Sequence, residues 1–280
     1  MKIAISVEST ADLTKELLSE FDISLIPYTI TLGDEVFKDG EIPTEELFKK
    51  ADALKILPKT TALNSFEYSE YFTSLLTKYD AVVHLCLSSG LSSSCQNAIN
   101  ASKEFENVFV VDSKSLSTGI GLLAIYGRKL ALEGKSAQEI CQILTEKTSD
   151  LQVSFVIERL DYLYKGGRCS AMQYFGANLL KFRPKIAVKN GKMGSDGKYR
   201  GSMDRVVSKY CAQTLESNKP NLSMAFVTYT TASPEMVSAA REALINAGFE
   251  NIYETHAGGT IASHCGAHTL GILYFTESAK

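Results

Sequence analysis

Three segments of the chain gather hydroxyl, imidazole and glycine groups of a kind that could hold a small anion. The first, Ser88-Ser89-Gly90-Leu91-Ser92-Ser93-Ser94, places five hydroxyls between an apolar run and a helical pattern. Loops at the carboxyl ends of parallel strands face the binding crevice of an open sheet, and a helix start offers free N–H groups to an anion. A carboxylate or a phosphate would fit there, although a helix start capped by serines is the simpler explanation of the cluster alone.

The second and third segments have the same polar character. Pro58-Lys59-Thr60-Thr61-Ala62-Leu63-Asn64-Ser65 is a hydroxyl-rich loop between two helical segments, where an ordinary turn and helix cap is the alternative. Ala262-Ser263-His264-Cys265-Gly266-Ala267-His268 sets imidazoles among glycines. A histidine in such a setting can approach a ligand closely, titrates near neutrality and can donate to an anion. The alternative for His264 is a hydrogen-bonded histidine of the core.

Cys265 beside His264 suggests a second hypothesis, in which the thiol is a nucleophile. Neighbours on a strand point to opposite faces of the sheet, so a buried and inert thiol is favoured. A small-molecule transferase or hydrolase that uses Cys265 or His264 in the same crevice stays the alternative function. A regulatory or structural interaction module is a third.

Other sequence patterns exclude common cofactor sites. Gly119-Ile120-Gly121-Leu122-Leu123-Ala124 has the form of a dinucleotide fingerprint, but seven residues separate it from the preceding predicted strand and no acid follows about 20 residues later. We interpret it as close helix packing. The sequence contains no Walker A loop, no H-E-x-x-H and no G-x-S-x-G, and its Cys and His residues lack zinc spacing. Neither a metal nor a cofactor is predicted.

The composition is that of an ordinary soluble protein. In 280 residues, 29 Lys and Arg face 32 Asp and Glu, and 45% of the residues are hydrophobic. A net charge of −3 provides no global positive field for a nucleic acid or an anionic membrane. The six cysteines include no C-x-x-C pair, which favours a reduced, cytoplasmic protein. Nothing near Met1 resembles an export signal, since Glu8 interrupts the first apolar run.

Two stretches of 22 residues, Ala81 to Ser102 and Thr255 to Thr276, contain no Asp, Glu, Lys or Arg. A membrane span needs about 20 mostly apolar residues. The first stretch is rich in serine, and the second contains three histidines and four glycines. We therefore expect no transmembrane segment, which leaves transient membrane contact open.

The first half of the chain alternates short apolar runs with amphipathic helical segments, which predicts βαβ units and a parallel sheet. Strands are predicted at 2–7, 24–31 (with Pro27 indicating an edge or a bulge), 81–87 and 108–111, and helices at 14–21, 45–54, 66–78, 119–133 and from Ser136 onward. Past residue 150 the pattern changes. Strands are predicted at 153–157, 223–229 and 270–275, a hairpin at Asn190-Gly191, and helices at 203–215 and 234–247.

The predicted fold class is therefore α/β with two domains. Residues 1–150 would form a domain with a mostly parallel sheet and flanking helices. Residues 151–280 would form a mixed-sheet α/β domain.

Five motifs in the right order make the chain resemble the DegV family of lipid-binding proteins, from Lys2 to Tyr274. The motifs are Glu8-Ser9-Thr10-Ala11-Asp12-Leu13, Pro58-Lys59-Thr60-Thr61, Ser88-Ser89-Gly90-Leu91-Ser92, Leu163-Tyr164-Lys165-Gly166-Gly167-Arg168-Cys169-Ser170, and His264-Cys265-Gly266 with Gly271. Each motif is weak alone, but the ordered set is specific.

The resemblance implies a long-chain fatty acid, such as palmitate, in a buried tunnel between two α/β domains. It implies that Thr60 and Ser92 hold the carboxylate with His264 close by, and that Thr61, Arg200 and Gly266 support the anionic end. It also implies a role in phospholipid metabolism as the non-catalytic subunit of a fatty acid kinase, presenting the carboxylate to a separate ATP-binding subunit. In that reading the protein is not an enzyme, has no catalytic residue and needs no cofactor.

The chain departs from the family pattern around the expected head-group site. Ala62 and Leu63 stand where the family usually has Gln-Pro, Ser93 replaces a glycine, and Ala267-His268 replaces Pro-Gly. Glu8 replaces the usual aspartate, so an acid is kept.

Overall fold

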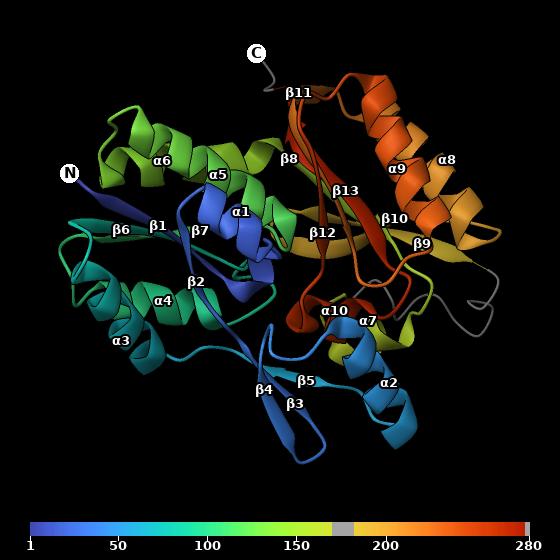
Figure 1. The fold of residues 1–280 in the computed structure, drawn as a ribbon, viewed down its shortest axis with the longest axis horizontal. Coiled ribbons are helices and arrows are strands. Elements are labelled where there is room, and N and C mark those ends of the chain that lie inside the picture. The colour runs from blue at the N-terminus through green and yellow to red at the C-terminus, as the bar shows by residue number, and fades with distance from the viewer. Residues whose placement is uncertain (170–181, 278–280) are drawn as a thin grey trace.

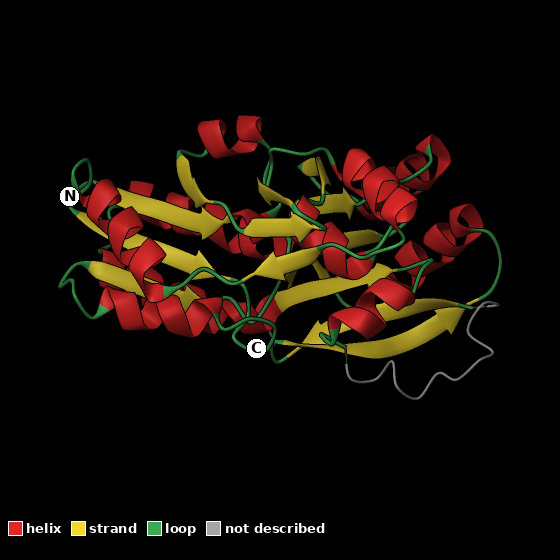
Figure 2. Cartoon of the chain, turned by 90° about the horizontal axis from the view of Figure 1, so that it is seen from below, coloured by secondary structure: helices red, strands yellow, loops and turns green. Residues whose placement is uncertain are grey.

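The computed structural model describes residues 1–169 and 182–277 and forms two main sheets and one small sheet, with helices on their faces (Figures 1 and 2). The strand orders are β2-β1-β6-β7, β10-β9-β8-β13-β11-β12 and β4-β3-β5. The first sheet is built from residues 3–112 and the second from residues 151–276. The α/β class with a parallel sheet followed by a mixed sheet is confirmed.

The first sheet is wholly parallel. Its strands are β1 (Ile3–Glu8), β2 (Ile23–Ile26), β6 (Ala81–Cys86) and β7 (Val108–Asp112). Its helices are α1 (Lys15–Glu20), α3 (Ser65–Leu76), α4 (Ser94–Ser102), α5 (Thr118–Leu132) and α6 (Ala137–Lys147), with 3-10 turns η1 (Ser9–Ala11) and η2 (Thr148–Asp150). Helices α5 and α6 cover one face and α3 and α4 the other (Figure 1). The strands are apolar along their length because both faces are covered.

The second sheet pairs antiparallel except at β11 with β12. Its strands are β8 (Leu151–Val156), β9 (Arg183–Lys189), β10 (Lys192–Tyr199), β11 (Pro220–Tyr229), β12 (Ile252–His256) and β13 (Leu270–Thr276). Helices α8 (Met203–Ser217) and α9 (Pro234–Ala247) pack together on this sheet. The predicted hairpin joins β9 to β10, with positive φ at Asn190 and Gly191, as its two-residue turn requires.

Helix α5 lies between the two main sheets and contacts both, on β1 and β6 and on β8, β11 and β13. Its glycines make this approach close. A Cβ on Gly119 would lie 2.9 Å from Val153 Cγ2, and one on Gly121 would lie 2.8 Å from Leu13 Cδ2. The interpretation of the G-x-G pattern as helix packing is confirmed.

The predicted single strand over 24–31 is wrong. The chain forms β2 and then β3 (Thr29–Leu32) in a different sheet, where β3 pairs with β4 (Glu35–Lys38) and β5 (Lys59–Thr61). Pro27 stands between the two strands, and its missing N–H cannot continue a ladder of hydrogen bonds. Helix α2 (Thr44–Leu54) follows β4 in the chain.

The expectation that His264 and Cys265 lie on a strand is also wrong. They end α10 (Gly259–Cys265), a helix of seven residues that the sequence pattern did not reveal, as it also missed α7 (Asp161–Gly166) and β12. The backbone N–H of Gly258 donates to Asp12 Oδ1 at 2.8 Å, and that of Thr260 donates to Asp39 Oδ2 at 3.3 Å. Contacts with distant residues therefore hold the start of a helix that is too short to be stable alone.

One apolar core runs from the parallel sheet through α5 into the second sheet, joining Ile5, Leu123, Phe155 and Leu273 among others. A domain boundary near residue 150 therefore stays a prediction. In the described part of the chain, no helix is both long enough and apolar enough to span a bilayer.

Candidate functional site

A cavity of about 80 Å³ lies where the parallel sheet, the small sheet and α10 meet. Its polar lining comes from Tyr28, Thr60, Ser92, Ser93, Arg168, Thr260 and His264. Its apolar lining comes from Ala62, Leu87, Leu91, Leu116, Met193, Ile261 and Cys265. The structure thus brings together the three residues predicted to hold a carboxylate, which come from β5, the loop after β6 and α10.

Thr60 and His264 are joined directly. Thr60 Oγ1 lies 2.9 Å from His264 Nε2, and Thr60 is held in place by the pairing of β5 with β3. Burial, and then the positive charge of Arg168, lower the pKa of His264 to about 4. The imidazole is therefore neutral at pH 7, and its buried Nδ1 has no hydrogen-bond partner among the residues that the structure describes. Gly166 leaves room for this ring, since a Cβ there would lie 2.7 Å from Nδ1.

Ser92 lies in the loop between β6 and α4, at the carboxyl end of the parallel sheet. Its Oγ accepts the backbone N–H of Ser94 at 3.2 Å and lies 3.3 Å from the hydroxyl of Tyr28. Ser93 is the N-cap residue of α4 but makes no side-chain cap hydrogen bond. The hydroxyl of Ser93 is therefore not used to cap α4, and Ser93 lies in the cavity lining.

The neighbouring strands keep this loop in place. The Ser88 hydroxyl donates to the carbonyl of Gly191 at 2.8 Å, which attaches the loop to the turn between β9 and β10. A Cβ on Gly90 would lie 2.5 Å from that same carbonyl oxygen. Only a glycine allows the two backbones to approach so closely.

The segment 58–65 contains both an ordinary helix cap and a cavity residue. Asn64 caps α3, as the simpler alternative predicted, while Thr60 faces the cavity.

Arg168 is a cation in the cavity wall that sequence reasoning did not select. Its Nη1 donates to the carbonyl of Gly166 at 2.7 Å and its Nε to that of Leu91 at 3.4 Å. In the sequence, the run Lys165-Gly166-Gly167-Arg168 suits a contact between a guanidinium and an anion, but a solvated surface arginine is the simpler interpretation of an isolated Arg. Tyr28 and Thr260 also line the cavity, and no pattern in the sequence marks them.

The three residues predicted to support the anion lie outside this lining. Thr61 is exposed beside Thr60, because neighbours on a strand face opposite sides. Gly266 is buried against the ring of Tyr162. Arg200 is exposed, with its guanidinium 4.5 Å from the centre of the Phe182 ring.

Two of the departures from the family pattern lie in the cavity lining. Ala62 and Ser93 line it, and the backbone N–H of Leu63 donates to Ser94 Oγ at 3.2 Å just behind it. His268 is exposed in the turn before β13.

The thiol of Cys265 faces the same cavity but is a poor nucleophile. Burial raises its pKa to about 12, with smaller contributions from Asp12 and Cys169. The thiolate is the reactive form, and it is almost absent at neutral pH. This property disfavours the alternative of a transferase or hydrolase that uses Cys265.

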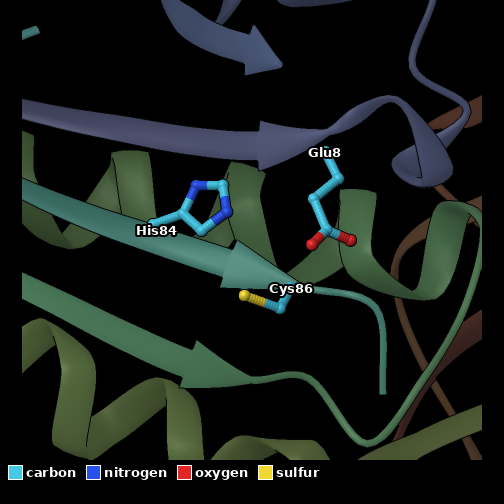
Figure 3. A group of neighbouring side chains, drawn as sticks. All are labelled: Glu8, His84 and Cys86. Atoms are coloured by element: carbon cyan, nitrogen blue, oxygen red, sulfur yellow. The ribbon is translucent and has the colours of Figure 1, made fainter. Parts of the chain in front are cut away.

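Glu8 at the end of β1 and His84 and Cys86 on β6 form a buried cluster (Figure 3). The segment from Ser88 to Ser94, called the serine loop below, follows β6 in the chain. The potential ligand atoms of the cluster lie within 4.8 Å of one another. However, the Glu8 carboxylate already accepts hydrogen bonds from three hydroxyls and one backbone N–H, and burial, with smaller effects of its neighbours, raises the pKa of the Cys86 thiol. A metal ion here would have to displace those four donors and the thiol proton, so the donor set fits hydrogen bonding better than metal binding.

The sequence of the chain is similar to those of known proteins over almost its whole length. The profile of the DegV family, described as uncharacterised proteins, matches residues 2–277. A protein of Thermotoga maritima named a fatty acid-binding protein is 30% identical over 283 residues, covering 97% of this chain and 96% of its own.

Two solved structures have the same fold. A DegV family protein from Thermus thermophilus, described by its fatty acid binding, is 27% identical, with a TM-score of 0.89 over 99% of this chain and 100% of its own. DegV of Bacillus subtilis, described as a fatty acid binding protein, is 25% identical, with a TM-score of 0.85 over the same shares of the two chains. By its sequence and its fold, this chain belongs to the DegV family.

Proposed function

We propose that this protein binds a long-chain fatty acid, with the carboxylate at Thr60, Ser92 and His264. The observation that carries the proposal is the joint presence of these three groups in one cavity, although they lie on three separate elements. The fatty acid binding of two relatives, from Thermotoga maritima and Thermus thermophilus, supports the same ligand class.

The polar groups of the cavity suit a carboxylate. Burying an ionised carboxylate without partners costs several kcal/mol, roughly, so the site must replace the lost water. Hydroxyls of Thr60 and Ser92 and the imidazole of His264 are donors for this purpose, and Arg168 adds a positive charge at the wall.

The acyl chain has an apolar route away from these groups. A second cavity, of about 20 Å³, shares Leu116, Ile261 and Cys265 with the first and continues to Phe155 and Leu273. Both are far smaller than typical ligand sites of about 300–1,000 Å³. The three shared side chains must therefore shift to admit a long chain, and burial of the chain repays this at about 0.8 kcal/mol per CH₂.

The protein in this proposal has no catalytic residue. It presents the carboxylate, for example of palmitate, to the ATP-binding subunit of a fatty acid kinase and contributes in this way to phospholipid metabolism. The weakly acidic thiol of Cys265 is consistent with a binding role. The cavity lining does not include Thr61, Gly266 or Arg200. In this proposal they would support the anionic end of the ligand through their backbone groups, or from the side on which the kinase subunit binds.

Mass spectrometry of the purified protein under denaturing conditions tests the ligand. We expect a released fatty acid, or micromolar binding of palmitate or oleate by the delipidated protein. A protein that is empty and binds neither acid would refute the proposal. Addition of ATP and a fatty acid kinase subunit tests whether the protein presents the carboxylate for phosphorylation. The expected product is an acyl phosphate. Its absence would limit the protein to storage or transport of the fatty acid.

A further inference from the structure

The carboxylate of Glu8 lies at the end of two chains of hydroxyl groups that begin in the serine loop. Its Oε1 accepts the hydroxyl of Tyr68. Its Oε2 accepts the N–H of Leu87 at 2.8 Å, the hydroxyl of Thr10 at 3.1 Å and the hydroxyl of Tyr28 at 3.3 Å. Glu8 is fully buried, at 0% exposure, so these four donors replace all of its water.

The direction of each hydrogen bond follows from counting protons. A tyrosine hydroxyl has one proton, so a tyrosine that donates to Glu8 can only accept from the serine behind it. Tyr28 lies 3.3 Å from Ser92 Oγ, and Tyr68 lies 2.9 Å from Ser94 Oγ. With Glu8 ionised, the protons of both serines therefore point away from the cavity. Ser92 then presents only an oxygen lone pair to a ligand.

This arrangement is unsuited to a carboxylate, which needs a donor at Ser92. Protonation of Glu8 removes the conflict. The new O–H of Glu8 donates to the Tyr28 oxygen, Tyr28 donates to Ser92 Oγ, and the Ser92 proton becomes free to point into the cavity. The proton comes from solvent, one O–H bond forms on Glu8, and two hydroxyls rotate without any change in the heavy atoms.

We propose that Glu8 is a positioning residue that takes up one proton when a carboxylate binds at Ser92, and so converts Ser92 from an acceptor to a donor. The inference rests on the proposed binding of a fatty acid. If Glu8 stayed ionised, its negative charge and that of the bound carboxylate would both be present, separated only by the hydroxyls of Tyr28 and Ser92.

The surroundings of Glu8 favour this protonation. The titratable groups that face it are Tyr28 from the β2–β3 connection, Tyr68 from α3, and His84 and Cys86 from β6. Burial is the largest cause of the pKa shift in each of these four groups, and it disfavours their charged forms. Cys95 and Asp112 also raise the pKa of Cys86. Burial likewise raises the pKa of Glu8, against the lowering effect of its four hydrogen bonds. No cation contributes to this shift among the described groups.

Calorimetry on the delipidated full-length protein tests the proposal. Binding of dodecanoate is measured from pH 6 to 9 in phosphate and in Tris, whose ionisation enthalpies differ. Above the pKa of Glu8 in the free protein, we expect an uptake approaching one proton per ligand and a Kd that rises up to about tenfold per pH unit. A wild-type protein that binds dodecanoate without proton uptake at any pH in this range would overturn the inference but not the proposed function.

Glu8→Gln identifies the group that takes the proton. The amide has the size of the protonated carboxyl and cannot take up a proton, so we expect binding with no proton uptake and a flat pH profile. If the variant keeps the wild-type uptake, the proton goes to the ligand itself and the inference is wrong. If the wild-type protein binds neither dodecanoate nor palmitate at any pH, the proposed function fails and the inference fails with it.

Tyr28→Phe and Tyr68→Phe form a matched pair that does not depend on the folding of the Glu8 variant. Tyr28→Phe breaks the chain to Ser92 and should abolish the proton uptake linked to binding. Tyr68→Phe breaks only the chain to Ser94, so it should keep the uptake, with its midpoint at higher pH because Glu8 loses a donor. Equal pH profiles in both variants would contradict the proposal.

Discussion

Thr60 Oγ1 lies 2.9 Å from His264 Nε2, although the two residues are 204 positions apart in the chain. The contact joins the small sheet, through β5, to the helix that precedes the last strand. It forms one side of the cavity, and the serine loop forms another. A carboxylate at this place would thus contact segments from both ends of the chain.

Ser92→Ala and His264→Ala should each weaken the retention of a fatty acid. A hydrogen bond to a charged group contributes about 1.5–3 kcal/mol, so we expect a Kd that is about 10 to 150 times higher in each variant. Equilibrium binding of palmitate, with a circular dichroism spectrum to verify the fold, measures the effect. Ser74→Ala is the control, since Ser74 is exposed on α3 and its hydroxyl donates to the carbonyl of Tyr71 in the same helix. Wild-type affinity in both cavity variants would refute the site.

Cys265 should resist alkylation in the native protein. Its thiol is buried and its pKa is about 12, so little thiolate forms at pH 8. Peptide mass spectrometry after iodoacetamide treatment should find Cys265 modified only when the protein is unfolded. Cys141, which is half-buried, is the internal comparison. Rapid native labelling of Cys265 would instead favour the nucleophile hypothesis.

Gly90→Ala should destabilise the fold and weaken ligand binding together. The new Cβ would lie 2.5 Å from the Gly191 carbonyl oxygen, which forces the serine loop away from the turn between β9 and β10. We expect a loss of about 1–3 kcal/mol in the free energy of unfolding, measured in urea. At Gly194, in β10, a new Cβ would have no atom of the described residues within 4 Å, so Gly194→Ala should leave this free energy nearly unchanged. Equal stability of the two variants would contradict the close approach.

His84 should make the protein less stable in acid. Burial lowers its pKa to about 3, whereas a histidine in an unfolded chain has a pKa of about 6.5. As the pH falls from 6.5 toward 3, the unfolded state binds a proton that the folded state cannot. The free energy of unfolding then decreases by up to about 1.4 kcal/mol per pH unit.

His84→Phe tests this dependence, because Tyr68, Tyr71 and Phe72 already surround the ring. Urea unfolding of both proteins between pH 4 and 7 isolates the imidazole, since His264 and the carboxyl groups are common to both. The slope against pH should be smaller in the variant. The same slope in both proteins would assign the acid sensitivity to other groups.

Local patterns in the sequence were sufficient for most elements of the fold. Ser136 and Glu139 form a capping box at the start of α6, where a helix from Ser136 was predicted, and Asn190-Gly191 forms the predicted hairpin turn. Such signals act within a few residues, and the periodicity of apolar residues extends them over a helix or a strand. Pro27 indicates an edge or a bulge, but the division of this segment into two strands depends on a second sheet that the sequence does not reveal.

The sequence by itself determined the residue types of the candidate site, because hydroxyls, an imidazole and glycines stand in ordered motifs. Only the tertiary structure decided which of them meet. It selected Thr60 over Thr61, formed α10 through contacts with Asp12 and Asp39, and brought Arg168 to the cavity. The physical reason is range: a helix of seven residues, or a hydroxyl chain from Ser92 to Glu8, is held by groups distant in sequence, and no local pattern encodes their approach.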